Sequence, residues 1–513
     1  MAEGELRRTT LLGARWLLLW AAFVSVRPEP QVPCYFIFGD SLVDNGNNNN
    51  IASLAVANYP PYGIDFPGGP SGRFTNGLTT VDVIGTVLSA SVLSCSSNAA
   101  TVSAIMTATA TALHREDLVP YGGSLVLRAT SFMLQTINSF VCDKFHVLVL
   151  YHFKQASKRG CGTFCVWWQD AVTYLNRAWR RIEFDCKAED SKCRIGAYPV
   201  IGSAQLLGFD DLIPPYASTR GQALLAGVNF ASAAAGIREE TGRQLVGLLR
   251  KGGRIPFGGQ LQNYQSAVQE MVSILGDEDS AADYLSKCIF SVGLGSNDYL
   301  NNYFMPAFYS TGQQYTPEQY ADELIQQYSQ QLRTLYKYGA RKVVLIGVGQ
   351  VGCSPNELAQ RSPDGVACVE EINSAIRIFN AKLIEVVDEF NAALDGAHFI
   401  YIDGYGIFED ILRNPAENGE EPALSVISSN TYLTLCVVSG LSVTNRGCCG
   451  VGRNNGQITC LPYQAPCTNR DAYLFFDAFH PTEAANIIIG KRSYSARSPG
   501  DAYPMDIRRL ARL

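Results

Sequence analysis

Two short blocks at opposite ends of the chain carry residues that could together activate a nucleophile. Ser41 lies in the run FGDSLVDNG, directly after the apolar residues Tyr35–Phe38, and His480 lies in DAFHPTE, three residues after Asp477. A serine hydroxyl attacks at neutral pH when a histidine takes its proton and a carboxylate orients that histidine. Taken alone, each block is more often a turn or a helix cap than a catalytic site.

The scarcity of histidine strengthens this pairing. Only five histidines occur in 513 residues, and three of them lie in a segment of unlike composition, residues 86–203. His398 opens an apolar run, where we expect it to pack or to face solvent. His480 is therefore the best candidate for a general base, with Asp477 beside it.

Two further blocks could donate hydrogen bonds to a developing oxyanion. Asn297 lies in GLGSND after an apolar run, and a side-chain amide in that position stabilises negative charge in a transition state. Gly236 ends the run NFASAAAG, whose small residues allow a close backbone approach, so its N–H is a candidate second donor. Alone, these blocks would be read as a turn and a packing segment.

Short apolar runs alternate with helical patterns along most of the chain. Residues with helical spacing cover Pro317–Tyr338 and Cys368–Leu394. The runs that predict strands, each followed by Gly or Asp, are Tyr35–Phe38, Cys288–Val292, Lys342–Ile346 and His398–Ile402. This alternation predicts a doubly wound α/β sheet, in which functional residues gather after the carboxyl ends of the strands.

The four blocks, in this order, resemble those of the GDSL esterase/lipases, or SGNH hydrolases, and most closely their plant secreted branch. Residues 72–77 (GRFTNG) and 443–450 (VTNRGCCG) and the sequence from Tyr494 onward also resemble this branch. The resemblance covers about 34–85, 204–418 and 441–513. It implies a three-layer α/β/α, flavodoxin-like SGNH hydrolase fold with a mostly parallel five-stranded sheet.

The resemblance also implies roles for the candidate residues. Ser41 would be the nucleophile, His480 the general base and then acid, and Asp477 its orienting carboxylate. The oxyanion hole would comprise the backbone N–H groups of Ser41 and Gly236 and the Asn297 side chain. The expected reaction is hydrolysis of a small-molecule or lipid acyl ester through an acyl-Ser41 intermediate, with no cofactor or metal. Acyl transfer to an alcohol, or an inactive protein with a binding or structural role, are the alternatives.

The amino terminus and the composition suggest a secreted protein. Residues 1–30 combine Arg7 and Arg8 with an apolar stretch interrupted by Arg15, which predicts a secretory signal; a membrane anchor and an unstructured tail are the alternatives. Fifteen cysteines then favour disulfides in an oxidising compartment. A net charge of −6 and a mean hydropathy of +0.01 argue against a nucleic-acid partner and against multiple membrane spans. We expect an extracellular protein without stable membrane insertion, and its oligomeric state stays open.

Two segments, 86–203 and 419–440, do not fit the α/β pattern. Without them, residues 79–85 and 204–209 would read as one amphipathic helix. The cost of loop closure grows slowly with length, so a long insertion is tolerated if its ends lie together. We therefore expect one hydrolase domain, 31–85 plus 204–513, interrupted by two loosely ordered additions; an inserted lid domain is the alternative. Eight cysteines then remain, an even number that suits disulfides: Cys34, Cys288, Cys353, Cys368, Cys448, Cys449, Cys460 and Cys467.

Three other motifs invite different interpretations. Residues 347–352 (GVGQVG) match a dinucleotide-binding fingerprint, but Pro355 argues against a helix that continues from the third glycine. The set His146, His152, Cys161 and Cys165 fits no usual zinc spacing. The GCCG run at 447–450 favours structural disulfides over redox chemistry.

Overall fold

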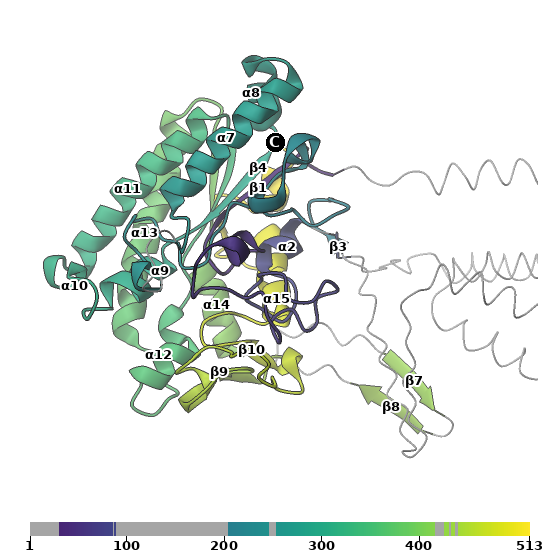
Figure 1. Cartoon of the computed structure of the whole chain (residues 1–513), viewed down its shortest axis with the longest axis vertical. Helices are drawn as coiled ribbons and strands as arrows, with labels where there is room; N and C mark the ends of the chain where they lie inside the picture. Colours follow the sequence, from purple (N-terminus) through teal and green to yellow (C-terminus); the bar gives the residue numbers. More distant parts are fainter. Residues whose placement is uncertain are drawn as a thin grey trace, which may run out of the picture. The chain divides into compact units, whose positions relative to one another are not determined.

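A five-stranded sheet forms the centre of the part of the chain that the structure describes (Figure 1). The computed structural model describes residues 30–85, 87–88, 204–245, 253–415, 425–429, 432–436 and 440–513. The strand order is β1 (Tyr35–Gly39), β4 (Ile289–Gly293), β5 (Lys342–Ile346), β6 (His398–Ile402) and β11 (Ala502–Tyr503). The first four strands are parallel and β11 is antiparallel to β6, which confirms the predicted mostly parallel sheet. The short edge strand β11 was not among the predicted strands.

Helices cover both faces of this sheet. Alternate strand residues such as Phe36 and Phe290 pack with α7 (Phe257–Leu275), α11 (Pro317–Lys337) and α13 (Glu370–Ala393). The opposite set, which includes Tyr35 and Ile289, packs with α2 (Thr80–Gly85), α14 (Gly404–Arg413), α15 (Glu483–Tyr494) and α16 (Ile507–Leu510). The predicted α/β/α layering is therefore present, and the two long helices predicted at 317–338 and 368–394 are α11 and α13 (Figure 1).

The remaining elements within the described residues are short. The other α-helices are α8 (Glu278–Ser286), α9 (Ser296–Asp298), α10 (Thr311–Gln314) and α12 (Pro355–Gln360). The other strands are β2 (Val87–Leu88), β3 (Ala204–Gln205), β7 (Ser425–Ser429), β8 (Tyr432–Cys436), β9 (Val443–Gly447) and β10 (Tyr473–Phe475). Tighter or wider helical turns are η1 (Asn47–Asn50), η2 (Tyr216–Ser218), η3 (Gly221–Ala226), η4 (Arg243–Leu245), η5 (Tyr299–Tyr303), η6 (Val351–Cys353), η7 (Arg453–Asn455) and η8 (Arg470–Ala472).

The ends of the first long insertion lie side by side. Helix α2 stops at Gly85, and β2 then pairs antiparallel with β3. The Leu207 N–H donates to the Ile84 carbonyl at 3.1 Å. In this structure residues 80–85 form α2 and residues 204–205 pair with 87–88, so the two segments do not join into one helix. The expectation that 86–203 is loosely ordered falls outside the described residues except at β2; within 419–440, only the antiparallel pair β7–β8 is described.

All eight cysteines singled out by the sequence form disulfides. Cys34–Cys288 joins the residues that precede β1 and β4, and Cys353–Cys368 joins η6 to the segment before α13. The adjacent cysteines of the GCCG run pair separately, as Cys448–Cys467 and Cys449–Cys460. The structural interpretation of this run is therefore confirmed.

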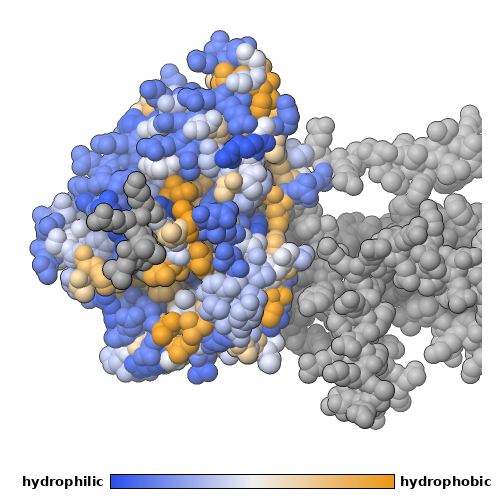
Figure 2. Space-filling model, in the orientation of Figure 1, coloured by the Kyte–Doolittle hydropathy of each residue, from blue (hydrophilic) through white to orange (hydrophobic). Residues whose placement is uncertain are grey.

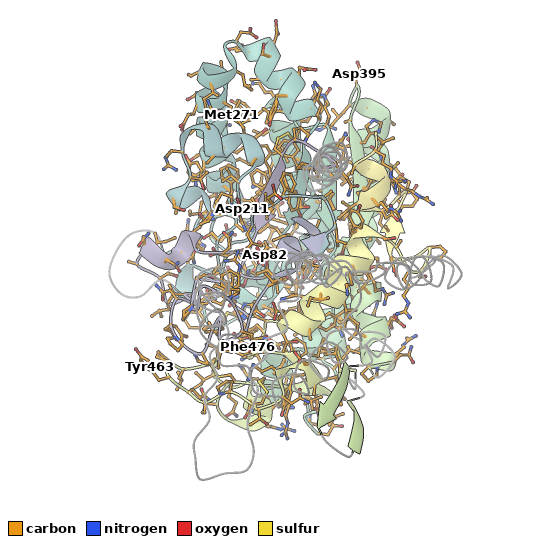
Figure 3. The ribbon with its side chains drawn as sticks, turned by 90° about the vertical axis from the view of Figure 1, so that its right-hand side faces the viewer. Asp82, Asp211, Met271, Asp395, Tyr463 and Phe476 are labelled. Atoms are coloured by element: carbon orange, nitrogen blue, oxygen red, sulfur yellow. A yellow bond between two sulfur atoms is a disulfide. The ribbon has the colours of Figure 1, made fainter. Side chains whose placement is uncertain are left out.

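The face shown in Figure 2 is mostly hydrophilic, with apolar side chains in separate patches. Large apolar side chains with more than half of their area exposed are Leu54, Phe308, Val366, Ile458, Tyr463 and Leu513. Tyr463 projects from the edge of the molecule, whereas Phe476 is fully buried inside it (Figure 3).

Candidate active site

The turn after β1 presents the Ser41 hydroxyl. A Cβ atom on Gly39 would lie 2.5 Å from Val43 Cγ2 and 3.0 Å from the Gly293 carbonyl, so the end of the strand requires glycine. The Asp40 carbonyl then accepts hydrogen bonds from the N–H groups of Val43 and Asp44 and closes the turn. Ser41 is partly exposed at its tip.

Ser41, His480 and Asp477 form one hydrogen-bonded line. The Ser41 Oγ lies 2.8 Å from His480 Nε2, and His480 Nδ1 lies 2.8 Å from both Asp477 carboxylate oxygens. Asp477 is fully buried and His480 is 8 % exposed. The Phe74 ring packs on the imidazole, with centroids 4.8 Å apart. The three residues therefore have the arrangement that proton transfer from a serine to a histidine requires.

The Asp477 carboxylate stays ionised despite its burial. Burial alone would raise its pKa, but the neighbouring His480 and several hydrogen bonds bring the pKa below the usual range. One of these bonds comes from the Tyr62 hydroxyl at 2.5 Å, and the Thr459 hydroxyl also donates to the carboxylate at 2.9 Å; the sequence analysis identified neither side chain. Tyr62 lies 415 residues from Asp477, and no motif links the two.

The segment that carries Gly236 extends the sheet beyond β1. The Ile37 N–H donates to the Val228 carbonyl, and the Phe230 N–H donates back to the Ile37 carbonyl. The Ser232 N–H then bonds to the Gly39 carbonyl at 3.1 Å. This parallel pairing brings the following residues, up to Gly236, alongside the Ser41 turn.

Close packing at Gly236 excludes any side chain. A Cβ atom there would lie 2.5 Å from Thr241 Cγ2 and 2.6 Å from Asp298 Oδ1. Ala234, two residues earlier, is buried with a φ of 63°, a backbone conformation that a non-glycine residue adopts only at some cost. The loop is therefore held in one conformation by its surroundings.

Buried polar side chains tie the Ser41 turn to the Gly236 loop. Asp44 accepts from the Ala233 N–H at 3.0 Å, and Asn47 Nδ2 donates to the carbonyls of Asn229 and Ala231. Burial raises the pKa of Asp44 to about 6, although hydrogen bonds from backbone N–H groups oppose that rise. These contacts fix the two loops relative to each other.

Asn297, at the start of α9, lies against the same loop. Its Nδ2 donates to the Ala235 carbonyl at 3.0 Å and to Asp40 Oδ2 at 3.2 Å, while its Oδ1 accepts from Asn301 Nδ2. The bond from Asn301 fixes which way the Asn297 amide faces. The longer bond, to Asp40, is the one that a substrate oxygen could share or replace.

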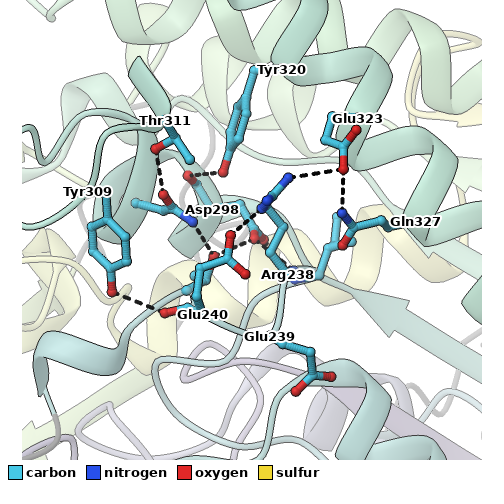
Figure 4. A network of polar contacts seen from close by, with 12 residues as sticks. Arg238, Glu239, Glu240, Asp298, Tyr309, Thr311, Tyr320, Glu323 and Gln327 are labelled. Carbon is cyan, nitrogen blue, oxygen red and sulfur yellow. Dashed lines mark hydrogen bonds and ion pairs between the residues drawn. The ribbon is translucent and has the colours of Figure 1, made fainter. Parts of the chain in front are cut away.

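Asp298 forms hydrogen bonds with the two residues that follow Gly236, and Figure 4 shows it together with Arg238 and Tyr320. Its carboxylate accepts from the N–H groups of Ile237 at 2.9 Å and Arg238 at 3.1 Å, and from the Thr241 hydroxyl at 2.7 Å. The Tyr320 hydroxyl donates to the Asp298 carbonyl at 3.0 Å. Burial raises the pKa of Asp298 to about 6.

Two backbone donors remain beside Ser41. Within the described ranges, no hydrogen bond uses the N–H of Ser41 or of Gly236. Together with the Asn297 amide, these are the groups that the sequence analysis expects as oxyanion donors, and that role stays a prediction. The structure therefore brings all five predicted site residues into one region.

Backbone N–H groups of the loop at residues 347–352 (GVGQVG) donate hydrogen bonds to side chains of α13. The Val348 N–H donates to Asn380 Oδ1 and the Gly352 N–H to Asn373 Oδ1, each at 3.0 Å. Helix α12 begins only at Pro355, with Ser354 as its cap. These contacts do not favour a dinucleotide site. The set His146, His152, Cys161 and Cys165 lies outside the described residues.

Comparison with known proteins gives a consistent result. The family model described as GDSL-like Lipase/Acylhydrolase matches residues 195–493. GDSL esterase/lipase At5g45670 of Arabidopsis thaliana is 48 % identical over 487 residues, which cover 95 % of this chain and 94 % of that protein. GDSL esterase/lipase At1g29660 of the same plant is 44 % identical over 511 residues, which cover the full length of both chains. GDSL esterase/lipase 7, also from Arabidopsis thaliana, is 33 % identical over 489 residues, which cover 94 % of this chain and 93 % of that protein. Such similarity over nearly the whole length, joined to the fold described above, means that this chain belongs to the GDSL-like lipase/acylhydrolase family.

Proposed function

We propose that this chain hydrolyses carboxylic acyl esters through an acyl-Ser41 intermediate. The observation that carries the proposal is the line of 2.8 Å contacts from Ser41 Oγ through the His480 ring to Asp477. Membership of a lipase and acylhydrolase family supports the same reaction class.

In the acylation step, Ser41 Oγ attacks the ester carbonyl carbon while His480 Nε2 takes the hydroxyl proton. The carbonyl oxygen becomes an oxyanion, which accepts hydrogen bonds from the N–H groups of Ser41 and Gly236 and from Asn297 Nδ2. Donors that are fixed before the reaction stabilise this charge without reorganisation. The tetrahedral intermediate collapses when His480 donates its proton to the leaving alcohol.

In the deacylation step, water replaces the alcohol. His480 Nε2 takes a proton from the water as its oxygen attacks the acyl carbon. The second intermediate collapses to the free acid, and the proton returns to Ser41 Oγ. Asp477 remains ionised throughout and stabilises the imidazolium of His480, in keeping with its lowered pKa.

An assay with p-nitrophenyl acetate and longer p-nitrophenyl esters tests the proposal. We expect ester hydrolysis by the intact chain and a loss of about a thousandfold or more in Ser41→Ala. Ser273→Ala, on the exposed face of α7, is the matched control and should retain full activity. Labelling by an organophosphonate, mapped by mass spectrometry, should place the adduct on Ser41. Equal rates for Ser41→Ala and the intact chain would refute the assignment.

The acceptor of the acyl group is a separate question. The same three residues would also support transfer to an alcohol. Product analysis in the presence of a soluble alcohol separates the two, since hydrolysis yields the acid and transfer yields a new ester. We propose hydrolysis as the main reaction, in keeping with the lipase and acylhydrolase family of this chain.

We also propose that the protein acts outside the cell. The apolar amino-terminal stretch and the four disulfides support export to an oxidising compartment. Among the described residues, no helix is both long and apolar enough to cross a membrane. Amino-terminal sequencing of protein recovered from culture medium should show cleavage near residue 30.

A further inference from the structure

The carboxylate of Asp477 is saturated with hydrogen-bond donors. Besides the His480 ring, Oδ1 accepts from the N–H groups of Phe479 at 2.9 Å and His480 at 2.8 Å. Oδ2 accepts from the hydroxyls of Tyr62 at 2.5 Å and Thr459 at 2.9 Å. The two backbone donors belong to the turn itself, whereas Tyr62 and Thr459 come from distant loops. Their convergence on one oxygen therefore needs its own explanation.

The number of available protons shows which hydroxyl, that of Tyr62 or that of Thr459, is the main donor to Asp477. Tyr62 and Thr459 have one hydroxyl proton each, yet three contacts join them and Asp477, since the two hydroxyl oxygens also lie 2.9 Å apart. The shortest contact joins Tyr62 to Asp477, so the phenol keeps its proton and directs it at the carboxylate oxygen. The Thr459 proton is left to be shared between Asp477 Oδ2 and the phenol oxygen. Tyr62 is thus the main donor.

Aromatic packing fixes the direction of the Tyr62 hydroxyl. Its ring is 1 % exposed and makes edge contacts with Tyr59, Phe74 and Phe476, at centroid distances of 5.3, 5.8 and 5.5 Å. Burial and the nearby charge of Asp477 raise the pKa of Tyr62 well above its ordinary value, so the phenol remains a donor at any working pH. Thr459 is held next to Cys460 of the Cys449–Cys460 disulfide.

We propose that Tyr62, assisted by Thr459, is a positioning residue that fixes the Asp477 carboxylate and limits its basicity. This inference rests on the proposed function. Hydrogen bonds to a carboxylate stabilise its charged form and withdraw charge from it, an effect that is strong in a buried site. The carboxylate then orients His480 without holding a proton too tightly on the imidazole of the resting enzyme.

If Tyr62 has this role, removal of its hydroxyl should change the pH dependence of kcat/KM in a defined direction. In Tyr62→Phe the carboxylate has one fewer donor, so it attracts the proton of the imidazolium more strongly. The unprotonated His480 that takes the serine proton is then reached only at higher pH. The acidic limb of the kcat/KM profile should therefore move upward, because that limb reports the free enzyme's essential base.

The test is the pH profile of p-nitrophenyl acetate hydrolysis by Tyr62→Phe. We expect the acidic limb to move up by about 0.5 unit and the plateau kcat to fall about tenfold, with KM nearly unchanged. Tyr264→Phe is the matched control. Its buried phenol donates to the Tyr338 carbonyl from α7, and its loss should leave the limb in place. An unmoved limb in Tyr62→Phe, or an equal shift in Tyr264→Phe, overturns the inference.

Thr459 supplies a second and milder variant in case Tyr62→Phe does not fold. Thr459→Val should shift the limb in the same direction by a smaller amount, and Thr459→Ser should restore the wild-type profile. An unmoved limb in Thr459→Val would also count against the inference. Ser41→Ala distinguishes a failure of the proposed function from a failure of the role of Tyr62. Activity in Ser41→Ala refutes the proposed function. If Ser41→Ala is inactive and the acidic limb of the Tyr62→Phe pH profile does not move, only the role of Tyr62 is refuted.

Discussion

Asp298 accepts a hydrogen bond from the Ile237 N–H at 2.9 Å, and Ile237 directly follows the proposed oxyanion glycine. Asp298 itself follows Asn297, the proposed side-chain donor. The carboxylate of Asp298, the last residue of α9, therefore links the segments that carry the two proposed oxyanion donors, which are far apart in sequence.

Removal of this carboxylate should reduce turnover more than substrate affinity. In Asp298→Ala, the N–H groups of Ile237 and Arg238 and the Thr241 hydroxyl lose a buried acceptor, which frees the loop. We expect kcat to fall about a hundredfold with little change in KM, since misplaced donors act mainly on the transition state. Asp322→Ala, at an exposed site on α11, should match the wild type.

A side chain at the oxyanion glycine should have a similar effect on catalysis. The Cβ atom of Gly236→Ala would overlap Thr241 and Asp298, so the backbone N–H must move. The expected loss in kcat is about 10²–10³-fold. Gly349→Ala is the control, because its Cβ atom would find no neighbour closer than 3.8 Å. Full activity in Gly236→Ala would rule out its N–H as a donor.

The buried Asp44 predicts a pH effect on stability. Burial raises its pKa to about 6 from 3.8, so the folded state binds the proton more tightly than the unfolded state. Its contribution to stability is therefore complete below about pH 4 and is lost as the pH rises toward 6. Relative to the wild type, Asp44→Asn should gain in melting temperature between pH 4 and pH 7. Parallel melting curves across that range would contradict the assignment.

The buried ion pair between Arg73 and Asp82 should contribute to the free energy of unfolding. Arg73 contacts both carboxylate oxygens of Asp82, at 2.7 and 2.8 Å, and Asp82 also accepts from Thr79; Asp82 lies on α2 (Figure 3). Because one partner would be left as an unpaired buried charge, Asp82→Asn should lower the free energy of unfolding by about 3 kcal/mol. The exposed Asp322–Lys382 pair is the comparison, and Asp322→Asn should cost less than about 1 kcal/mol.

The position of the long insertion predicts that it can be removed. Leu88 and Ala204 are paired residues of β2 and β3, so a loop of about four residues can join them as a hairpin. A chain in which such a loop replaces 89–203 should fold and hydrolyse p-nitrophenyl acetate within about threefold of the full chain. A folded but inactive product would show instead that the segment contributes to the site.

The sheet and the proposed triad could be predicted because each has a local signal. Apolar runs before glycine indicated β1 and β4 to within one residue, and the shortage of histidine pointed to His480. Strand β11 has only two residues, too few for any periodic pattern, and it pairs antiparallel at the edge. It exists because β6 offers it an open edge, which is a tertiary property.

The side chains that position the proposed triad and the Gly236 loop have no such local signal in the sequence. Tyr62 and Thr459 are common residue types in loops, and they meet Asp477 only after the chain has folded. Asp44 and Asp298 lie within recognised blocks, yet their task of holding the Gly236 loop depends on contacts 189 and 61 residues away. Chemistry-bearing residues could be predicted from motifs, whereas the residues that position them could not.

The separation of 439 residues between Ser41 and His480 also has a consequence for biosynthesis. The proposed nucleophile leaves the ribosome first, and its proposed base follows 439 residues later. A nascent or prematurely terminated polypeptide that stops before Asp477 carries the serine without the means to activate it. The proposed esterase chemistry is thus withheld until the block that contains Asp477 and His480 has been translated, which protects acyl esters in the compartment of synthesis from a partly made enzyme.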